Sequence, residues 1–487
     1  MNTVAAFPVP LKDEYLFCQK SYVNGAWTNA EGEETLTVVN PATQEALGTV
    51  PRMGSMEARR AIQAASDAFP GWSRRGLQER SAIMRKWAEL LRQNQDDLAT
   101  LITAEQGKPI VESRAEILCA AELIEWYAEE GKRIRGEIGP QLPLGRQTFV
   151  IKEALGVVAV VTPCNDPAEI VIRKAGPALS SGCTLVLNPS TATPFSALAL
   201  AELGERAGIP PGVFNVVCGP LDAIGKELSS NSAVRMVAFV GSAETARKFR
   251  GRHPASTAKY TFELSGRGIF MVFSDADLDA SVPAAIASCF RNTGQAFIRT
   301  DRFIIQENLF EIFIEKFSEA AAGLKVGDGL KGNTQLGPLI DEDYLHSVVS
   351  RIAAAKAGGG RVVTGGQGHA LGGTYYQPTV IAARDAMPAN FELPGPAALV
   401  SRFKNEREAI RLVTELQPMA AACCFTRDLD RAWHLAHLIR AERVGINTAL
   451  YPPNSEALEG TGQGGFGEGM FRNGLDEFLA GKYLSIG

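Results

Sequence analysis

Gly-Val-Val-Ala-Val-Val-Thr, at residues 156–162, decides the fold, because a short apolar run rich in valine predicts a strand buried on both faces. A helical pattern follows at residues 170–180, and a second apolar run at residues 184–187. The alternation continues, with strands predicted at 213–217 and 234–240 and helices at 195–207, 222–230 and 244–250. Strands that alternate with helices form parallel sheets with crossover helices. The sequence therefore predicts a doubly wound α/β domain of the nucleotide-fold kind.

A second α/β unit is predicted after residue 263. Its strands are expected at 269–273 and 302–305 and its helices at 278–290 and 309–323, and the pattern continues to about residue 447. The N-terminal region is expected to differ. Asn24-Gly25 predicts a hairpin turn, a strand pair is predicted at 36–40 and 47–50, and helical periodicity is predicted at 55–94, broken near Pro70, and at 95–131.

Length and composition narrow the class of protein. A chain of 487 residues is too long for one hydrophobic core, so two or three lobes are expected. The formal net charge of -5 lacks the basic character of a nucleic-acid-binding surface. No apolar run approaches the ~20 residues of a membrane span, and the first residues do not form a signal peptide, so a cytoplasmic location is predicted. The dispersed cysteines and histidines predict no metal site.

Residues 290–302 carry the most specific pattern. Asn292, Gly294 and Gln295 form an Asn-x-Gly-Gln motif, and Phe297 follows it after one intervening residue. The segment resembles the nucleophile segment of the aldehyde dehydrogenase superfamily, in which the catalytic cysteine stands at that position. Phenylalanine has no lone pair with which to attack a carbonyl carbon. The resemblance therefore implies the family's scaffold with altered chemistry.

Other segments extend the resemblance from residue 24 to the tail. They are residues 173–179, 182–184, 195–198, 212–217 and 275–279. Within the family, the chain is most similar to the succinate-semialdehyde dehydrogenase type. The resemblance implies a cofactor domain (1–133 and 152–262), a catalytic domain (263–470) and a β-strand arm (134–151 and 471–487). The arm implies a homodimer or homotetramer.

The resemblance also implies a site for NAD or NADP. The phosphate turn is expected at Gly241 and Ser242, where a helix N-terminus offers donors to an anion; a plain helix cap by Ser242 is the alternative. Asn188 replaces the family's ribose-binding lysine, whereas Glu392 keeps the glutamate that holds the nicotinamide ribose. Losing one charged donor costs roughly 1.5–3 kcal/mol, which a site can tolerate, but several changed positions together argue against binding of NAD or NADP.

Three residues match positions of the reaction chemistry or lie beside them. Asn165 matches the asparagine that stabilises the oxyanion, and Glu263 matches the general base that activates water. A turn residue between two prolines and a hinge carboxylate are the structural alternatives. Cys164 lies beside Asn165 and is a candidate for a relocated nucleophile, provided that its thiol reaches the carbonyl and ionises.

The predicted substrate residues are mainly charged. Arg173 and Arg291 match two arginines that grip the substrate carboxylate in the succinate-semialdehyde branch, because a guanidinium bonds a carboxylate through two donors. Asp166, Phe297 and Arg299 depart from the family and are also expected to line the pocket. Unpaired charges are costly to bury, so these changes favour remodelling for a different ligand. An ion pair of Arg299 with Asp301 or Asp166 that only stabilises the lobe is the alternative. For Arg173 and Arg291, surface or interdomain ion pairs are the alternative.

Three functions compete on the sequence alone. The leading hypothesis is a repurposed family member that performs non-redox chemistry on a small carboxylate-bearing carbonyl or imine compound, with Glu263 moving protons and Asn165 stabilising an oxyanion. The first alternative is an NAD(P)-dependent aldehyde dehydrogenase that uses Cys164. The second is a non-catalytic partner of an active homologue. Whether the chain is an enzyme is left open between them.

Overall fold

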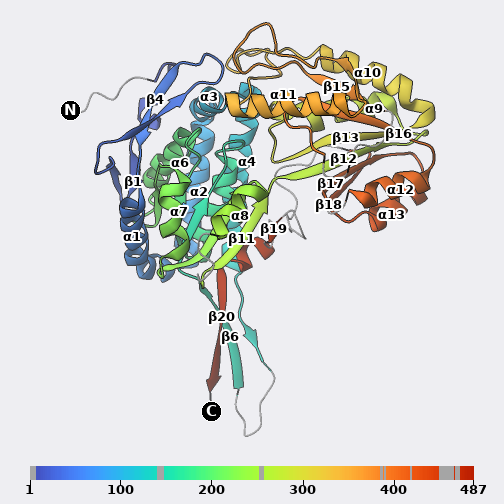
Figure 1. Cartoon of the computed structure of the whole chain (residues 1–487). Coiled ribbons are helices and arrows are strands. Elements are labelled where there is room, and N and C mark those ends of the chain that lie inside the picture. The colour runs from blue at the N-terminus through green and yellow to red at the C-terminus, as the bar shows by residue number, and fades with distance from the viewer. Residues whose placement is uncertain are drawn as a thin grey trace.

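The computed structural model describes residues 7–139, 147–251, 257–383, 388, 391–416, 419–448, 465–466 and 472–486. Two lobes, each built on a sheet, lie side by side, and a narrow strand arm projects from the first (Figure 1). The predicted α/β fold class is confirmed. The predicted domain limits stay a prediction, and the limit at residues 470 and 471 lies outside the described residues.

The first lobe is built on an eight-stranded sheet. Its strands lie in the order β19 (Gly465–Phe466), β11 (Lys259–Leu264), β10 (Val234–Gly241), β7 (Val157–Val161), β8 (Thr184–Asn188), β9 (Phe214–Val216), β1 (Ser21–Val23) and β2 (Ala26–Thr28). The five strands from β11 to β9 are parallel to one another, whereas β19 and β1 pair with their two edges in antiparallel orientation. The predicted hairpin is confirmed, with Asn24 and Gly25 at positive φ between β1 and β2.

Helices cover both faces of this sheet, which explains why its central strand is wholly apolar. Val158 and Val160 belong to a core shared with α2, α4 and α6, whereas Val157, Ala159 and Val161 belong to a core shared with α1 and α7. Successive side chains of a strand point to opposite faces, so a strand covered twice needs apolar residues throughout. The helices are α1 (Ser55–Ser73), α2 (Leu77–Gln93), α3 (Gln95–Gln106), α4 (Ile110–Glu130), α5 (Glu169–Ser181), α6 (Pro194–Ala207), α7 (Leu221–Ser230) and α8 (Ala243–Gly251).

The strand order puts a topological switch point between β7 and β10. The chain passes from β7 to β8 and β9 on one side, and then returns to β10 and β11 on the other. Connections diverge at such a switch point, which leaves a crevice outside the carboxyl ends of the two strands. The loop after β7 carries residues 162–168, and the turn after β10 carries Ser242. Both predicted active-site segments therefore begin at this edge.

Two helix boundaries differ from the sequence prediction. The break predicted near Pro70 is wrong, because α1 continues to Ser73, where buried Trp72 donates its indole N–H to the Leu179 carbonyl at 3.1 Å. The single helical stretch predicted at 95–131 is also wrong. Gly107, with φ +94°, ends α3, and α4 begins only at Ile110. The break carries Lys108 into the interior, where it is 2% exposed.

The second lobe has a seven-stranded sheet. Its strands lie in the order β14 (Arg361–Thr364), β15 (Thr379–Ala382), β16 (Ala397–Phe403), β13 (Ile298–Gln306), β12 (Gly266–Val272), β17 (Met419–Phe425) and β18 (Ala441–Ile446). Helices α9 (Leu278–Phe290) and α10 (Phe310–Ala322) share a core with one face, and α12 (Glu406–Glu415) and α13 (Leu429–Leu438) share a core with the other. Helix α11 (Glu342–Ala357) packs near β15 and β16.

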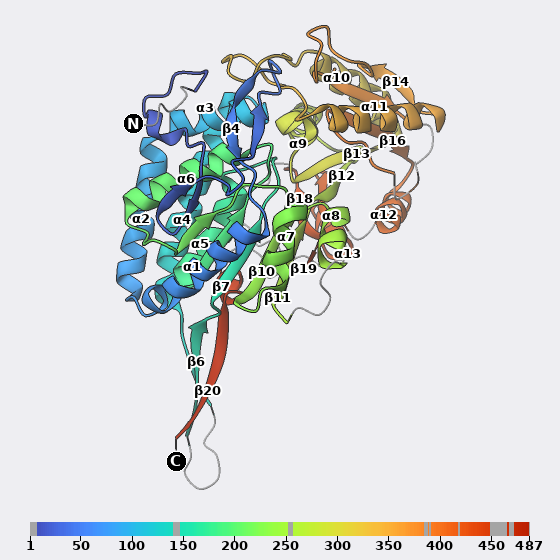
Figure 2. The same ribbon diagram turned by 60° about the vertical axis from the view of Figure 1, so that its left-hand side comes forward.

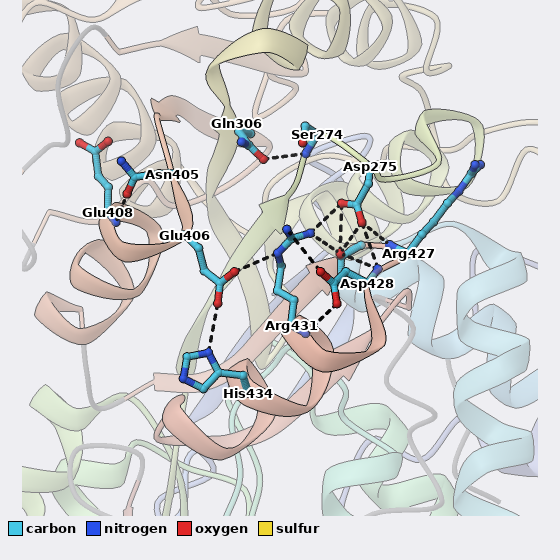
Figure 3. A network of polar contacts seen from close by, with 11 residues as sticks. Ser274, Asp275, Gln306, Asn405, Glu406, Glu408, Arg427, Asp428, Arg431 and His434 are labelled. Atoms are coloured by element: carbon cyan, nitrogen blue, oxygen red, sulfur yellow. Dashed lines mark hydrogen bonds and ion pairs between the residues drawn. The ribbon is translucent and has the colours of Figure 1, made fainter.

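A polar network fixes α12 and α13 to the ends of the strands (Figure 3). Arg431 of α13 donates to Asp275 at 2.9 Å and to Glu406 at 3.1 Å. Its guanidinium also lies 4.7 Å from the centre of the Phe273 ring. One arginine thus joins α13, the start of α12 and the segment after β12, and this network is structural.

The arm consists of three antiparallel strands, β20 (Leu479–Ile486), β6 (Gln147–Ala154) and β5 (Glu137–Ile138). It extends away from both lobes and carries the C-terminus near its tip (Figures 1 and 2). The predicted strands at 147–151 and in the tail are confirmed.

The remaining elements are the strand pair β3 (Thr35–Val39) and β4 (Ala46–Pro51) and the short helix α14 (Arg472–Asp476). Among the described residues, no helix is long and apolar enough to cross a membrane.

Candidate active site

The loop after β7 is held against the segment that precedes β13. Asn292 donates its side-chain amide to the Asn165 carbonyl at 2.8 Å, and its backbone N–H to Glu112 of α4 at 2.8 Å. Cys164 and Asn165 are half-buried, and Asn292 is buried. The structure therefore brings the two predicted catalytic segments together at the switch point of the first sheet.

The segment itself is a strained 3₁₀ turn, Arg291–Gly294. Asn292 and Thr293 both adopt left-handed backbone conformations, with φ values of 51° and 55°. Such conformations are costly outside glycine and persist where the surroundings fix them. Here the bonds of Asn292 and a 3.1 Å bond from the Thr293 hydroxyl to the Gly337 carbonyl do so. Backbone held in this way is typical of a functional site.

Phe297 fills the space behind this turn. Its ring packs with Ile170 of α5 and Val240 of β10 in a small apolar cluster, and Phe297 is 8% exposed. The guanidinium of Arg173 lies 5.8 Å from the ring centre. The ring is thus an apolar contact between the two lobes.

Glu263 lies on β11, and its carboxylate is surrounded by cations. Lys174 donates to one oxygen and Arg173 to the other, and Arg173 also bonds Glu169. Burial alone would raise the pKa of Glu263, but Lys174 and Arg173 outweigh it and lower the pKa. Glu263 is therefore ionised at neutral pH and a weak base.

A second buried network lies below the Cys164 loop. The Lys108 ammonium donates to Glu116 at 2.8 Å and to Asp166 at 2.7 Å, and all three residues are buried. Glu116 in turn accepts the backbone N–H of Ala168 at 2.7 Å. The Asn165 amide donates to Asp166 at 3.3 Å. Lys108 and Asp166 thus fix the base of the loop and orient its asparagine.

The three predicted substrate arginines differ in their contacts. Arg173 is engaged by Glu169 and Glu263, and Arg299 donates to the Gly294 and Gly395 carbonyls. Arg291 is exposed, and no hydrogen bond or ion pair joins its side chain to another described residue. Although Arg291 reaches the surface, the protein atoms around its guanidinium partly desolvate it, which would lower its pKa, but the carboxylates of Asp166 and Glu112 outweigh this and raise the pKa. Arg291 is therefore the arginine whose donors remain available to a ligand.

The predicted cofactor residues only partly fit a dinucleotide. Gly241 ends β10, and the exposed Ser242 caps α8, because its hydroxyl accepts the backbone N–H of Thr245 at 3.1 Å, as the structural alternative expects. Glu392 is exposed enough to accept ribose hydroxyls. Asn188, however, donates its amide to the Val217 and Gly219 carbonyls. The exposed start of α8 and the Glu392 carboxylate are compatible with a dinucleotide, whereas Asn188 holds the loops rather than offering a donor.

Two thiols lie near the turn. Burial and the carboxylate of Asp341 raise the pKa of Cys164 to about 11, and Lys108 lowers it less. Burial raises the pKa of Cys289 to about 12; Cys289 is fully buried on α9, with its sulfur 3.6 Å from the Ala397 carbonyl. Cys164 is the more accessible of the two and shares its loop with Asn165.

Removing the charge of Asp341 is expected to lower the pKa of the Cys164 thiol. Asp341 caps α11 by accepting the Tyr344 N–H, and asparagine caps a helix equally well, so Asp341→Asn changes charge and not fold. Alkylation of Cys164 by iodoacetamide, followed by mass spectrometry across pH, should then be faster at pH 8 and unchanged well above pH 11. Glu342→Gln, in the same helical turn, is the control. Superimposable pH curves for Asp341→Asn and the native chain would contradict the assigned cause.

Comparisons with known proteins identify the family. The aldehyde dehydrogenase family profile matches residues 27–484. The chain is 43% identical to a glutarate-semialdehyde dehydrogenase of Pseudomonas aeruginosa and to an NADP⁺-type succinate-semialdehyde dehydrogenase of Escherichia coli, over 98% of this chain and 99% of each relative. The chain belongs to the aldehyde dehydrogenase family.

Solved structures show the same similarity. An NADP-dependent enzyme from Escherichia coli superimposes with a TM-score of 0.95 at 43% identity, covering 98% of this chain and 100% of the other. A betaine aldehyde dehydrogenase from Staphylococcus aureus, solved with NAD⁺, superimposes with a TM-score of 0.92 at 28% identity, covering 96% of this chain and 97% of the other. NAD(P) dependence is thus supported through the family.

These findings correct the leading functional hypothesis. A repurposed, non-redox enzyme is contradicted, because the full-length relatives at 43% identity are semialdehyde dehydrogenases. A non-catalytic status is not supported either. The site also has thiols, since Cys164 lies on the loop that the turn contacts and Cys289 on the helix that leads to it. The findings favour the alternative of an NAD(P)-dependent aldehyde dehydrogenase.

The sequence analysis missed several residues of the site. Lys108 and Lys174 bond the predicted carboxylates Asp166 and Glu263. Glu112 accepts the backbone N–H of Asn292, and Glu116 accepts that of Ala168 at the end of the Cys164 loop. One signal was available, because Gly107 and Pro109 bracket Lys108 and are typical of a helix break. Glu112 and Glu116 carry no such signal on an amphipathic helix. No metal-binding group of histidine, cysteine or carboxylate side chains occurs in the part of the chain that the structure describes.

Proposed function

We propose that this chain is an NAD(P)-dependent dehydrogenase of small aldehydes that carry an acid group, and that Cys164 is its nucleophile. The observation that carries the proposal is the full-length similarity to semialdehyde dehydrogenases at 43% identity. In this proposal Phe297 stands at the position of the family's thiol. Cys164 supplies a thiol from the facing loop, which Asn292 holds in place.

The residues of the loop and of β11 have separate roles. The Cys164 thiolate adds to the carbonyl carbon, and the Asn165 amide donates to the oxygen as it gains negative charge. Glu263 accepts a proton from the water that releases the acid; its lowered pKa makes this step slow, and Lys174 must yield its bond. Bound NAD(P) supplies the acceptor for the hydride that leaves the carbonyl carbon.

Arg291 is the proposed anchor for the acid group. Arg291 is the first residue of the turn that contacts the Cys164 loop, and no hydrogen bond or ion pair joins its guanidinium to another described residue. A guanidinium bonds a carboxylate through two parallel donors, which would orient the aldehyde end toward the loop. The charges of Asp166 and Glu112 keep Arg291 protonated and also limit its attraction for an anion.

The test is reduction of NAD⁺ and NADP⁺ with a panel of aldehydes between pH 7 and 10. Succinic and glutaric semialdehydes should be oxidised and butanal and pentanal much less, with a rate that rises with pH because the pKa of Cys164 is about 11. Arg291→Gln should raise KM for the semialdehydes about 10- to 100-fold, the value of a charge-assisted hydrogen bond, and leave butanal unaffected. Absence of reduced nicotinamide with every aldehyde at every pH would refute the proposal.

A further inference from the structure

The loop that carries Glu392 is held by charged side chains of β12 and β13. Arg302 donates to the Phe391 carbonyl at 2.7 Å, and Arg267 donates to the same oxygen at 3.1 Å. Asp301 accepts the backbone N–H of Leu393 at 3.0 Å. Hydrogen bonds to charged groups are stronger than neutral ones, and Asp301 and Arg302 are buried. The loop is therefore fixed on both sides of Glu392.

Arg299 joins this loop to the strained turn. One of its terminal nitrogens donates to the Gly294 carbonyl at 3.2 Å and also to the Gly395 carbonyl. The two backbones are in direct contact, since a Cβ added to Gly294 would lie 2.0 Å from the Gly395 oxygen. The Arg299 side chain is 10% exposed, so water cannot readily replace the hydrogen bonds that it donates to the two carbonyl groups. The turn and the Glu392 loop thus cannot shift independently while Arg299 is present.

The Glu392 carboxylate is occupied as well. Arg267 Nε lies 3.1 Å from Glu392 Oε1, and the Glu392 side chain is 56% exposed. A ligand hydroxyl that approaches this carboxylate must therefore compete with Arg267. Because Phe391 is also held by Arg302, the loop does not depend on Arg267 for its position.

We infer that Arg299 and Asp301 are positioning residues that hold the Glu392 loop against the turn, and that Arg267 competes with the ribose of the dinucleotide for Glu392. The inference rests on the proposed function for the identity of the ligand. Substitution of Arg299 should therefore weaken NAD(P) binding, and substitution of Arg267 should strengthen it. If both arginines were purely structural, both substitutions would change the affinity in the same direction.

The test is calorimetric binding of NAD⁺ and NADP⁺ to the full-length chain. Arg299→Met should weaken dinucleotide binding about tenfold or more, because two charge-assisted bonds that fix the loop are lost. Arg299→Lys should restore part of the affinity, since one ammonium can still reach a carbonyl. Arg267→Gln keeps a donor for the Phe391 carbonyl and removes the charge, and should tighten binding about two- to fivefold, the range for an exposed ion pair.

Hydrogen exchange separates failure of this inference from failure of the proposed function. The Leu393 and Ala397 amides bond Asp301 and the Gly395 carbonyl, and both should exchange faster in Arg299→Met than in the native chain. Unchanged exchange and unchanged affinity in Arg299→Met would overturn the positioning role, and weaker binding in Arg267→Gln would overturn the competition. If the native chain binds neither dinucleotide, the proposed function and the ribose assignment both fall, whatever the exchange rates.

Discussion

Cys164→Ser is expected to lower kcat for semialdehyde oxidation about a thousandfold or more. A serine hydroxyl stays protonated over this pH range and is a weaker nucleophile, whereas the thiol ionises as the pH approaches its pKa of about 11. The affinity for the dinucleotide should not change, because Gly241, Ser242 and Glu392 lie on other segments. Steady-state kinetics at pH 9 and dinucleotide binding by calorimetry provide the two measurements.

Two variants make this result specific to Cys164. Cys289→Ser should keep kcat within about threefold, since Cys289 is buried with its sulfur near the Ala397 carbonyl and takes no part in the proposed reaction. Phe297→Cys should raise activity at neutral pH and rescue Cys164→Ser, because under the proposed function it places a thiol at the position where the resemblance implies the family's catalytic cysteine. Retention of activity in Cys164→Ser, with loss in Cys289→Ser, would move the nucleophile to α9.

Lys108→Met is expected to destabilise the protein by about 3–5 kcal/mol, because it leaves two buried carboxylates without their cation. Glu116 and Asp166 both bond the Lys108 ammonium, and all three are buried. Burial, opposed by Lys108, raises the pKa of Glu116 to about 7. When the pKa of a carboxyl group is higher in the folded than in the unfolded state, the free energy of unfolding falls as the pH rises from the unfolded-state pKa to the folded-state pKa. The destabilisation caused by Lys108→Met, measured by urea denaturation, should therefore be larger at pH 8 than at pH 5.

The double variant Lys108→Met/Asp166→Asn is the control for charge. Removing one of the two stranded carboxylates should restore part of the stability lost in Lys108→Met, and the pH dependence should shrink with it. If Lys108→Met costs less than about 1 kcal/mol, the network is solvated and does not fix the Cys164 loop. If the double variant is no more stable than Lys108→Met, the loss comes from packing of the lysine stem rather than from charge.

Local patterns predicted much of the fold because the strands of both sheets are covered on two faces. Apolar runs such as 157–161 and 269–273 can be recognised as buried strands from the sequence alone. Asn24-Gly25 specifies its turn because both residues readily adopt positive φ. Trp72 and Gly107 show where local sequence fails to predict helix boundaries. Trp72 packs on α5, so that α1 continues through Pro70. Gly107 ends α3, although the helical periodicity continues beyond it.

The sequence by itself determined the family, the two α/β lobes and the segments that form the site, because these depend on order and periodicity along the chain. Only the tertiary structure decided which charges meet. Lys108 and Asp166 are 58 positions apart in the sequence, and Arg299 and Gly395 are 96 apart. The spacing of residues along the sequence therefore cannot predict either contact. Buried charges are stable only with partners, and the fold alone supplies those partners from distant segments.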